Sequence, residues 1–308
     1  MRVGLDIGGT KTDAVAIGDD GRVAHTLRLP TGFGADVVLH TAVAAVHQLS
    51  TLSGTPIDRF TSIGVGIPGA VDPATGRVSH AVNLGLEDLE LGAHLQERLG
   101  CAVRVENDVN AAALGAFHLL DRSPSQSMAY LNLGTGLAAG LVLGGRLWRG
   151  VRGVAGEIGH IPFDPAGPQC PCGQRGCLEL YASGSAVARQ WPSDDALPVR
   201  ALFAAAASGD ASAIAVRDRL LEGTAAAVRI LVLAVDVDDV VIGGGISRLG
   251  DELLDGVRAV IARWESESAF VASLGLGERL QLLPADFPAA AVGAAFVGDP
   301  EAHAVEVV

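Results

Sequence analysis

Long hydrophobic runs are missing from this sequence, although 49% of its 308 residues are hydrophobic. A membrane-spanning helix needs about 20 consecutive apolar residues, and the apolar stretches here, interrupted by 40 glycines, do not reach that length. The N-terminus MRVGLDIGGT also lacks the apolar core of a signal peptide, because Asp6 and two glycines break it. We therefore expect a cytoplasmic protein without a membrane span.

Cysteine and positive charge are also scarce. Four cysteines in 308 residues are too few for a secreted scaffold held together by disulfides. Lysine and arginine together number 22, against 35 aspartates and glutamates, which gives a net charge of −13. Nucleic acids and anionic lipids bind cationic protein faces, so this balance argues against both as partners.

Strand-like and helix-like segments alternate along the chain. Residues 2–23 have the pattern strand, glycine-rich turn, strand, turn and strand, and residues 127–150 repeat it. Alanine- and leucine-rich stretches indicate helices at 37–52, 110–120, 199–207, 211–235 and 251–265. This alternation predicts an α/β chain of two related halves, with the crossing between them near residues 118–127.

Three glycine clusters follow predicted strands, at residues 8–9, 134–136 and 243–245. A phosphate group needs several converging backbone N–H groups, and glycine allows the backbone to approach closely and to take a positive φ. One such cluster is typical of an ordinary β-turn, but two hairpins in matching positions and a third cluster favour nucleotide binding. Asp6, at the end of the first strand, is a candidate ligand of Mg²⁺ through water.

Asn107 and Asp108 follow another predicted strand and begin a predicted helix. Both residue types are favoured at the N-cap of a helix, so the residues alone leave a plain capping role open for Asp108. The alternative is that its carboxylate takes part in chemistry.

Three of the four cysteines lie within the eight residues from Cys170 to Cys177. The C-x-x-C spacing of a thioredoxin-type redox site is absent, and the spacing is too tight for a strain-free disulfide pair. Cys170, Cys172 and Cys177 with His160 would form a closed tetrahedral zinc site, the alternative being buried reduced cysteines. Because four protein ligands leave no position for water, such a zinc ion would be structural.

Seven motifs in this order resemble those of the ROK family of sugar kinases and sugar-sensing repressors. They are DIGGTK at 6–11, GIPGAVD at 66–72, VENDVNAAALGA at 105–116, LNLGTGLAAGLVLGGRL at 131–147, GVAGEIGH at 153–160, CPCGQRGCLE at 170–179 and VVIGGGIS at 240–247. The resemblance implies two actin-like (ribonuclease H-like) α/β domains with an interdomain cleft and a zinc knuckle. Residues 1–117 would form a small N-terminal domain, rejoined by the last helix at about 289–308, and residues 118–288 a larger domain carrying the zinc motif.

The same resemblance implies an enzyme that uses ATP with Mg²⁺ to phosphorylate a hexose at its primary O6 hydroxyl. Glucose is the first expectation. Amino or N-acetylated hexoses (N-acetylglucosamine, N-acetylmannosamine, glucosamine, kanosamine) are the alternatives. A sugar-sensing repressor is disfavoured, because the first glycine cluster begins directly after Asp6 and leaves no room for the DNA-binding segment of such repressors. By analogy with the family we expect a homodimer or homotetramer.

The resemblance also assigns roles to individual residues, with Asp108 as the base that accepts the proton of the sugar hydroxyl. The implied sugar contacts are Gly69, Asn83, Asn107, Asp108, Glu157, His160 and Glu179. The implied contacts to ATP and Mg²⁺ are Asp6, Gly8, Gly9, Thr10, Lys11, Gly134, Thr135, Gly136, Gly244 and Gly245. The implied ligands of the structural Zn²⁺ are His160, Cys170, Cys172 and Cys177. Many family members carry a tryptophan shortly after the position of Asn83, whereas this chain reads NLGLEDLEL there. This departure bears on which sugar the protein binds and not on the phosphate-binding residues.

Overall fold

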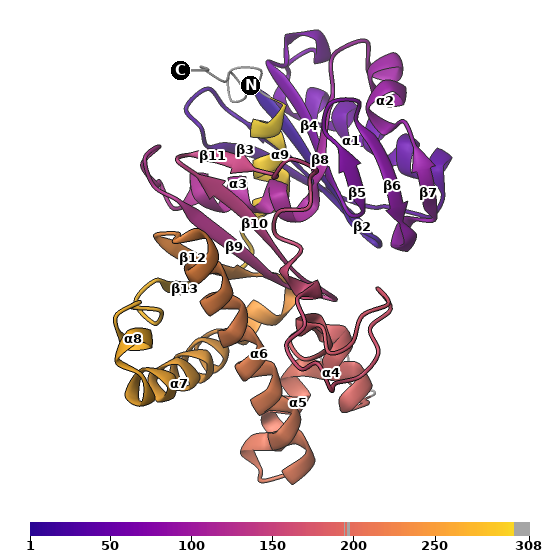
Figure 1. Cartoon of the computed structure of the whole chain (residues 1–308). Coiled ribbons are helices and arrows are strands. Elements are labelled where there is room, and N and C mark those ends of the chain that lie inside the picture. Colours follow the sequence, from indigo (N-terminus) through magenta and orange to yellow (C-terminus); the bar gives the residue numbers. More distant parts are fainter. Residues whose placement is uncertain (194, 196–197, 299–308) are drawn as a thin grey trace. The chain divides into compact units, whose positions relative to one another are not determined.

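The computed structural model describes residues 1–193, 195 and 198–298. Strands and helices follow one another along the chain in the order that Figure 1 shows. The chain divides into two compact units. The first comprises Met1–Ser125, Gly140–Val154 and the chain from Pro288 on, and the second comprises Gln126–Ala139 and Ala155–Phe287.

A five-stranded sheet forms the centre of the first unit. Its order is β3 (Val23–Pro30), β2 (Lys11–Ile17), β1 (Arg2–Ile7), β4 (Ser62–Ile67) and β8 (Arg104–Asn107). β1, β4 and β8 run parallel, whereas β2 pairs antiparallel with both β1 and β3. All six residues of β4 are buried, as expected for a parallel strand covered on both faces. The carboxyl ends of the three parallel strands therefore lie at one edge of the sheet.

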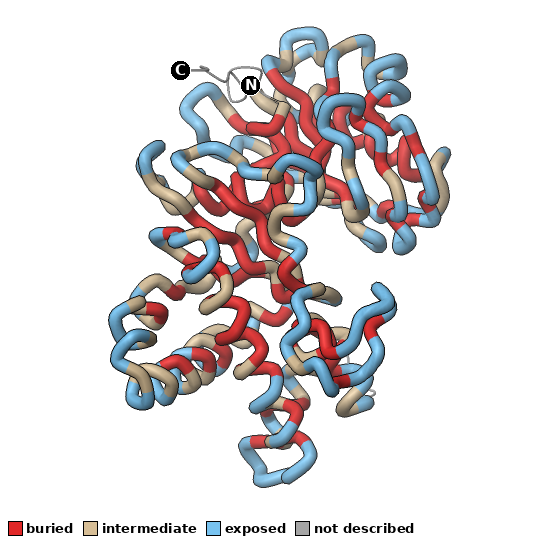
Figure 2. The backbone as a smooth tube through the Cα atoms, in the orientation of Figure 1, coloured by how far each residue is buried: buried red, intermediate tan, exposed pale blue. Residues whose placement is uncertain are grey.

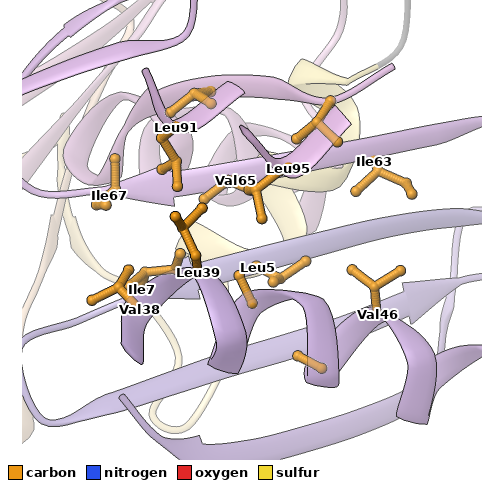
Figure 3. Close-up of a cluster of buried hydrophobic side chains, with 14 of the residues drawn as sticks. Leu5, Ile7, Val38, Leu39, Val46, Ile63, Val65, Ile67, Leu91 and Leu95 are labelled. Atoms are coloured by element: carbon orange, nitrogen blue, oxygen red, sulfur yellow. The ribbon is translucent and has the colours of Figure 1, made fainter. Parts of the chain in front are cut away.

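Two helices cover one face of this sheet. Figure 3 shows Leu5 and Ile7 of β1 in the same apolar cluster as Leu39 of α1 (Ala35–Ser53) and Leu95 of α2 (Leu91–Leu99). Side chains alternate across a strand, so the odd-numbered residues of β1 point to this face and the even-numbered ones to the other. Asp6 consequently belongs to the opposite face.

Glycines allow another helix to approach that opposite face closely. α9 (Ala289–Val297), yellow in Figure 1, packs against β1, β4 and α3 (Asp108–Leu119). A Cβ atom on Gly4 would lie 1.9 Å from a carbonyl oxygen of α9, and one on Gly64 would lie 1.8 Å from another. The close packing of α9 therefore depends on strand residues without side chains.

Gly293 of α9 faces the backbone of α3. A Cβ atom there would lie 1.7 Å from the carbonyl oxygen of Ala111. We expect Gly293→Ala to lower the free energy of unfolding by about 3 kcal/mol, because two buried helices must separate to admit the methyl group. Urea denaturation measures the change. Gly277→Ala is the matched control, since the nearest atom to its new Cβ lies 4.0 Å away. Equal urea midpoints for the two variants would contradict the prediction.

A small antiparallel sheet in the first unit carries two predicted site residues. Its strands, in order, are β5 (Ala70–Asp72), β6 (Arg77–Ala81) and β7 (Leu86–Leu89). Gly69, with a φ of 103°, makes the bend between β4 and β5. Asn83 lies in a 3₁₀ turn between β6 and β7.

The second sheet has the order β11 (Arg146–Trp148), β10 (Leu137–Leu143), β9 (Met128–Leu133), β12 (Asp239–Gly243) and β13 (Leu280–Leu282). Three strands consecutive in the chain come first, and β12 pairs parallel with both β9 and β13. This order matches that of the first sheet, which confirms the predicted repeat. The boundary between the two units falls within β10.

Five helices belong to the second unit. They are α4 (Gly184–Gln190), α5 (Pro198–Ala207), α6 (Ala211–Val235), α7 (Asp251–Glu267) and α8 (Ala269–Ala272). α6 packs against α5, α7 and β9, and the central strands of both sheets are mainly buried, red in Figure 2. Within the described ranges no single helix has the length and apolar composition of a membrane span; α5 and α6 match one only when taken together, with a bend of 118°.

The compact units differ in detail from the predicted domain limits. Residues 118–125 and 140–154 belong to the first unit. The predicted boundary between the domains lies between residues 117 and 118. The predicted last helix, at about 289–308, lies partly outside the described residues. Its described part, α9, packs on the first sheet. The assignment of the two domains remains a prediction.

Candidate active site

Two acidic side chains meet at the carboxyl edge of the first sheet. Asp6 of β1 is the register partner of Gly66 of β4, which is in turn paired with Glu106 of β8. Gly66 has no side chain, and a Cβ atom there would lie only 3.6 Å from the Cα atom of Asp108. The glycine therefore leaves room for Asp6 and Asp108 to lie near each other.

Asp6 has the environment of a cation ligand. Burial raises its pKa to about 7, with further increases from the negative charges of Asp108 and Asp13. A bound divalent cation would relieve this repulsion, so Asp6 fits the predicted Mg²⁺ site. Lys11, also predicted at this site, forms an ion pair of 3.1 Å between its Nζ and Oδ2 of Asp13.

Asn107 is the N-cap of α3. Its Oδ1 accepts hydrogen bonds from the N–H groups of Val109 and Asn110 at 3.0 and 3.2 Å, and its Nδ2 donates to the carbonyl oxygen of Gly69 at 3.2 Å. A sugar contact by Asn107 would therefore have to use the hydrogen-bonding capacity of its amide that remains after these three bonds. Asp108 is the first helical residue and is half-buried. The N-cap residue is thus Asn107, while Oδ1 of Asp108 also accepts a hydrogen bond from the N–H of Val109 at 2.9 Å.

Glu106 is a candidate that the sequence analysis missed. Its side chain is only 2% exposed. Oε1 accepts hydrogen bonds from the N–H of Asn107 at 3.0 Å and from Nδ2 of Asn110 at 2.9 Å, and Oε2 accepts one from Nε of Arg149 at 2.5 Å. These bonds hold the junction between β8 and α3, where Asp108 begins the helix. The strand has the sequence RVEN, in which Val105 alone is apolar, so local pattern gives no signal that Glu106 is buried. Only the fold supplies the partners that a buried charge needs.

The first glycine cluster lies beside a predicted sugar residue. Gly8 donates its N–H to the carbonyl oxygen of Lys11 at 2.9 Å, which closes the turn between β1 and β2. A Cβ atom on Gly9 would lie 3.3 Å from that of Asn83. The structure thus brings Gly9 and Asn83 together within the first unit, as it brings Gly69 to Asn107.

The second and third glycine clusters are neighbours in the second unit. Residues 134–136 follow β9. Residues 243–245 lie at the end of β12, which pairs parallel with β9. A Cβ atom on Gly244 would lie 2.5 Å from the carbonyl oxygen of Leu133. Apart from Gly245, its chain neighbours and the backbone of its own turn, no heavy atom of the described residues lies within 4 Å of the position that a Cβ would take on Gly245. This cluster therefore has open space beside it, as a ligand site requires.

The four predicted zinc ligands converge. The ligand atoms of His160, Cys170, Cys172 and Cys177 lie within 4.8 Å of one another, and the sulfurs of Cys172 and Cys177 are 3.6 Å apart. Tetrahedral zinc with bonds of about 2.3 Å places its sulfurs roughly 3.8 Å apart. Nδ1 of His160 is buried and has no hydrogen-bond partner within the part of the chain that the structure describes. A metal ion would supply that partner, so this donor set fits zinc.

The thiols of the cluster differ in acidity. Hydrogen bonds from the backbone of Gln174 and from Cys170 lower the pKa of Cys172 to about 6. Burial, followed by hydrogen bonding within the cluster, raises the pKa of Cys177 to about 12. Because zinc binds thiolates, the cation itself must stabilise the ionised form of the buried Cys177.

The two acidic residues that flank the cluster have different surroundings. Glu157 is exposed and is the N-cap of the 3₁₀ turn Ile158–His160, which contains the predicted zinc ligand His160. Glu179 is half-buried in the turn Leu178–Leu180, and its Oε2 accepts a hydrogen bond from the N–H of Leu137 at 3.0 Å. One oxygen of Glu179 is thus committed to the strand that follows the second glycine cluster.

The chain is similar to known proteins over nearly its whole length. The ROK family model matches residues 2–294. A glucokinase of Halalkalibacterium halodurans is 34% identical over 276 residues, which cover 83% of this chain and 83% of that protein. The ROK hexokinase structure from Thermus thermophilus has a TM-score of 0.80 at 33% identity, covering 97% of this chain and 98% of that one. The ROK family glucokinase structure from Streptomyces griseus, in complex with glucose and AMPPNP, has a TM-score of 0.75 at 31% identity, covering 96% and 98%. The predicted α/β fold class is confirmed, and the chain belongs to the ROK family.

Proposed function

We propose that this protein is a hexose kinase that transfers the terminal phosphoryl group of ATP to O6 of glucose. The observation that carries the proposal is the placement of Asp108 in a chain one-third identical to a glucokinase. Asp108 is half-buried at a helix N-terminus near Asp6, and its Oδ1 is held by a hydrogen bond of 2.9 Å from the N–H of Val109. This arrangement suits a base held in a defined position.

Asp108 accepts the proton of the sugar hydroxyl in this proposal. Phosphoryl transfer passes through a loose transition state, so the hydroxyl loses its proton late and the placement of the carboxylate matters more than its basicity. Glu106 and Asn107 supply that placement, because their hydrogen bonds hold the start of α3.

Mg²⁺·ATP is the proposed phosphoryl donor. Asp6 would hold the ion through water, and the bound ion would neutralise charge on the phosphates. Backbone N–H groups of the glycine clusters would bind phosphate oxygens, apart from those of Gly8 and Gly134, which donate to the carbonyl oxygens of Lys11 and Gly136. Thr10 and Thr135 add hydroxyl groups beside the first two clusters.

Each unit supplies its own set of proposed sugar contacts. In the first unit they are Gly69, Asn83, Asn107 and Asp108, and in the second they are Glu157, His160 and Glu179. Zinc at His160, Cys170, Cys172 and Cys177 would be structural, since four protein ligands leave no open position.

A coupled assay of ADP release tests the proposed activity. We expect turnover with glucose that exceeds turnover with mannose, fructose, glucosamine, kanosamine, N-acetylglucosamine and N-acetylmannosamine. 6-Deoxyglucose is the matched control substrate, because it lacks the O6 hydroxyl and should release no ADP above background. Faster turnover of an N-acetylated hexose would replace glucose as the substrate, and no turnover with any hexose would overturn the proposal.

A further inference from the structure

The second glycine cluster, residues 134–136, rests on the zinc-binding segment, defined here as residues 160–185, which runs from the predicted ligand His160 through Cys177 to the start of α4. The N–H of Gly184 donates to the carbonyl oxygen of Gly134 at 2.8 Å, and the N–H of Ser185 donates to that of Thr135 at 3.1 Å. All these residues belong to the second unit. Both hydrogen bonds use carbonyl groups of the cluster, so the supporting segment sets the direction of its peptide planes.

That direction has a consequence for the N–H groups of the cluster. In a planar trans peptide the C=O of one residue and the N–H of the next point in opposite directions. The carbonyls of Gly134 and Thr135 point to the segment, so the N–H groups of Thr135 and Gly136 point away from it, side by side. Successive N–H groups that point the same way form an anion-binding concavity.

Glu179 holds the other end of the cluster. Its Oε2 accepts the N–H of Leu137 at 3.0 Å and occupies the space beside Gly136, where a Cβ atom would lie 2.5 Å from that oxygen. The backbone of Glu179 is itself held, because Ser183 donates its hydroxyl to the carbonyl oxygen of Glu179 at 2.8 Å. The carboxylate therefore fixes the strand at the point where it leaves the cluster.

The zinc ligands hold the segment to which Glu179 belongs. The buried apolar cluster here is small, with Cys170, Cys177 and Leu180 as members and Tyr181 packed against them. Such a cluster contributes little hydrophobic stabilisation by itself. Cys177 directly precedes the turn that contains Glu179, so a metal bound to Cys177 also restrains Glu179.

We propose that Glu179 is a positioning residue for the second glycine cluster, and that through it the zinc-binding segment sets the affinity for the phosphates of a nucleotide. The inference rests on the proposed function in taking ATP as the ligand of this cluster. It gives the segment a role in nucleotide binding besides its proposed sugar contacts.

Binding of Mg²⁺·AMPPNP without sugar, measured by titration calorimetry, tests the inference. Glu179→Ala is expected to bind about tenfold more weakly, because it loses a hydrogen bond between a charged acceptor and the cluster. Glu179→Gln keeps an acceptor oxygen for Leu137 and should bind within about threefold of the wild type. Glu267→Ala removes an exposed carboxylate at the end of α7 in the same unit; it is the matched control and should bind AMPPNP as the wild type does.

Hydrogen exchange of the Leu137 amide supplies a readout independent of activity. It should accelerate in Glu179→Ala, with one zinc still bound per chain, and remain slow in Glu179→Gln. Unchanged exchange and unchanged AMPPNP affinity in Glu179→Ala would overturn the inference. Should that variant fail to fold, chelation of zinc from the wild type is the second test. Chelation should weaken AMPPNP binding and accelerate hydrogen exchange of the Leu137 amide. No change in either quantity would again overturn the inference.

The kinase assay stays separate from this test. If the AMPPNP affinity depends on Glu179 but the wild type phosphorylates no hexose, the proposed function alone is overturned. If the wild type phosphorylates glucose and the Glu179→Ala variant binds AMPPNP as tightly as the wild type, the positioning role alone is overturned.

Discussion

Asp108→Asn is expected to lower kcat for glucose phosphorylation by about 10³-fold, the loss typical of removing a positioned general base. The amide has nearly the shape of the carboxylate but does not accept the hydroxyl proton. The fold should be unaffected, because Asn107 caps α3 with two hydrogen bonds of 3.0 and 3.2 Å. Steady-state ADP release measures kcat, and thermal unfolding checks the fold.

Asn107→Asp is the matched control for this result. Aspartate caps helices as well as asparagine does, but it does not donate the hydrogen bond that Nδ2 gives to the carbonyl oxygen of Gly69. We expect it to retain far more activity than Asp108→Asn, with a change mainly in the KM for sugar. Residual activity of more than a few per cent in Asp108→Asn would remove Asp108 as the base.

Loss of one zinc ligand should have the second-largest effect. Wild-type protein prepared without chelator is expected to contain about one zinc per chain, and Cys177→Ala close to none. Cys177 is fully buried in a cluster with few apolar members, so without the metal the cohesion of residues 160–177 is lost. We expect a fall of at least about 100-fold in kcat/KM, a magnitude typical of disturbed metal sites, and faster proteolysis within residues 161–176.

Cys101→Ala supplies the control for this prediction. Cys101 lies in the first unit and packs against its main apolar core, apart from the four convergent ligands. The variant should keep one zinc per chain and near-normal activity, which separates metal loss from loss of a thiol. Full activity in wild-type protein that contains no zinc would contradict the structural role of the metal.

Local pattern predicted the longer elements well. The predicted helix at 211–235 coincides with α6, whose N-cap Asp210 accepts hydrogen bonds from Ser212 and Ala213, and the hairpin repeat is present in both sheets. The three-stranded sheet of β5, β6 and β7 was not predicted. β5 has only three residues, too few for a period of two to be recognised, and its stability depends on partners rather than on its own composition.

The sequence by itself determined the glycine clusters and the histidine–cysteine cluster, because each lies within a short stretch of chain, and the family, because its seven motifs occur in order. Tertiary structure decided how the site side chains are used. It buries Glu106 against Arg149, 43 positions along the chain, and joins Glu179 to Leu137, 42 positions away. It also makes Asn107 the N-cap of α3 and places Asp108 in the first helical position. Burial and long-range hydrogen bonds arise only when the chain folds, so no local motif contains them.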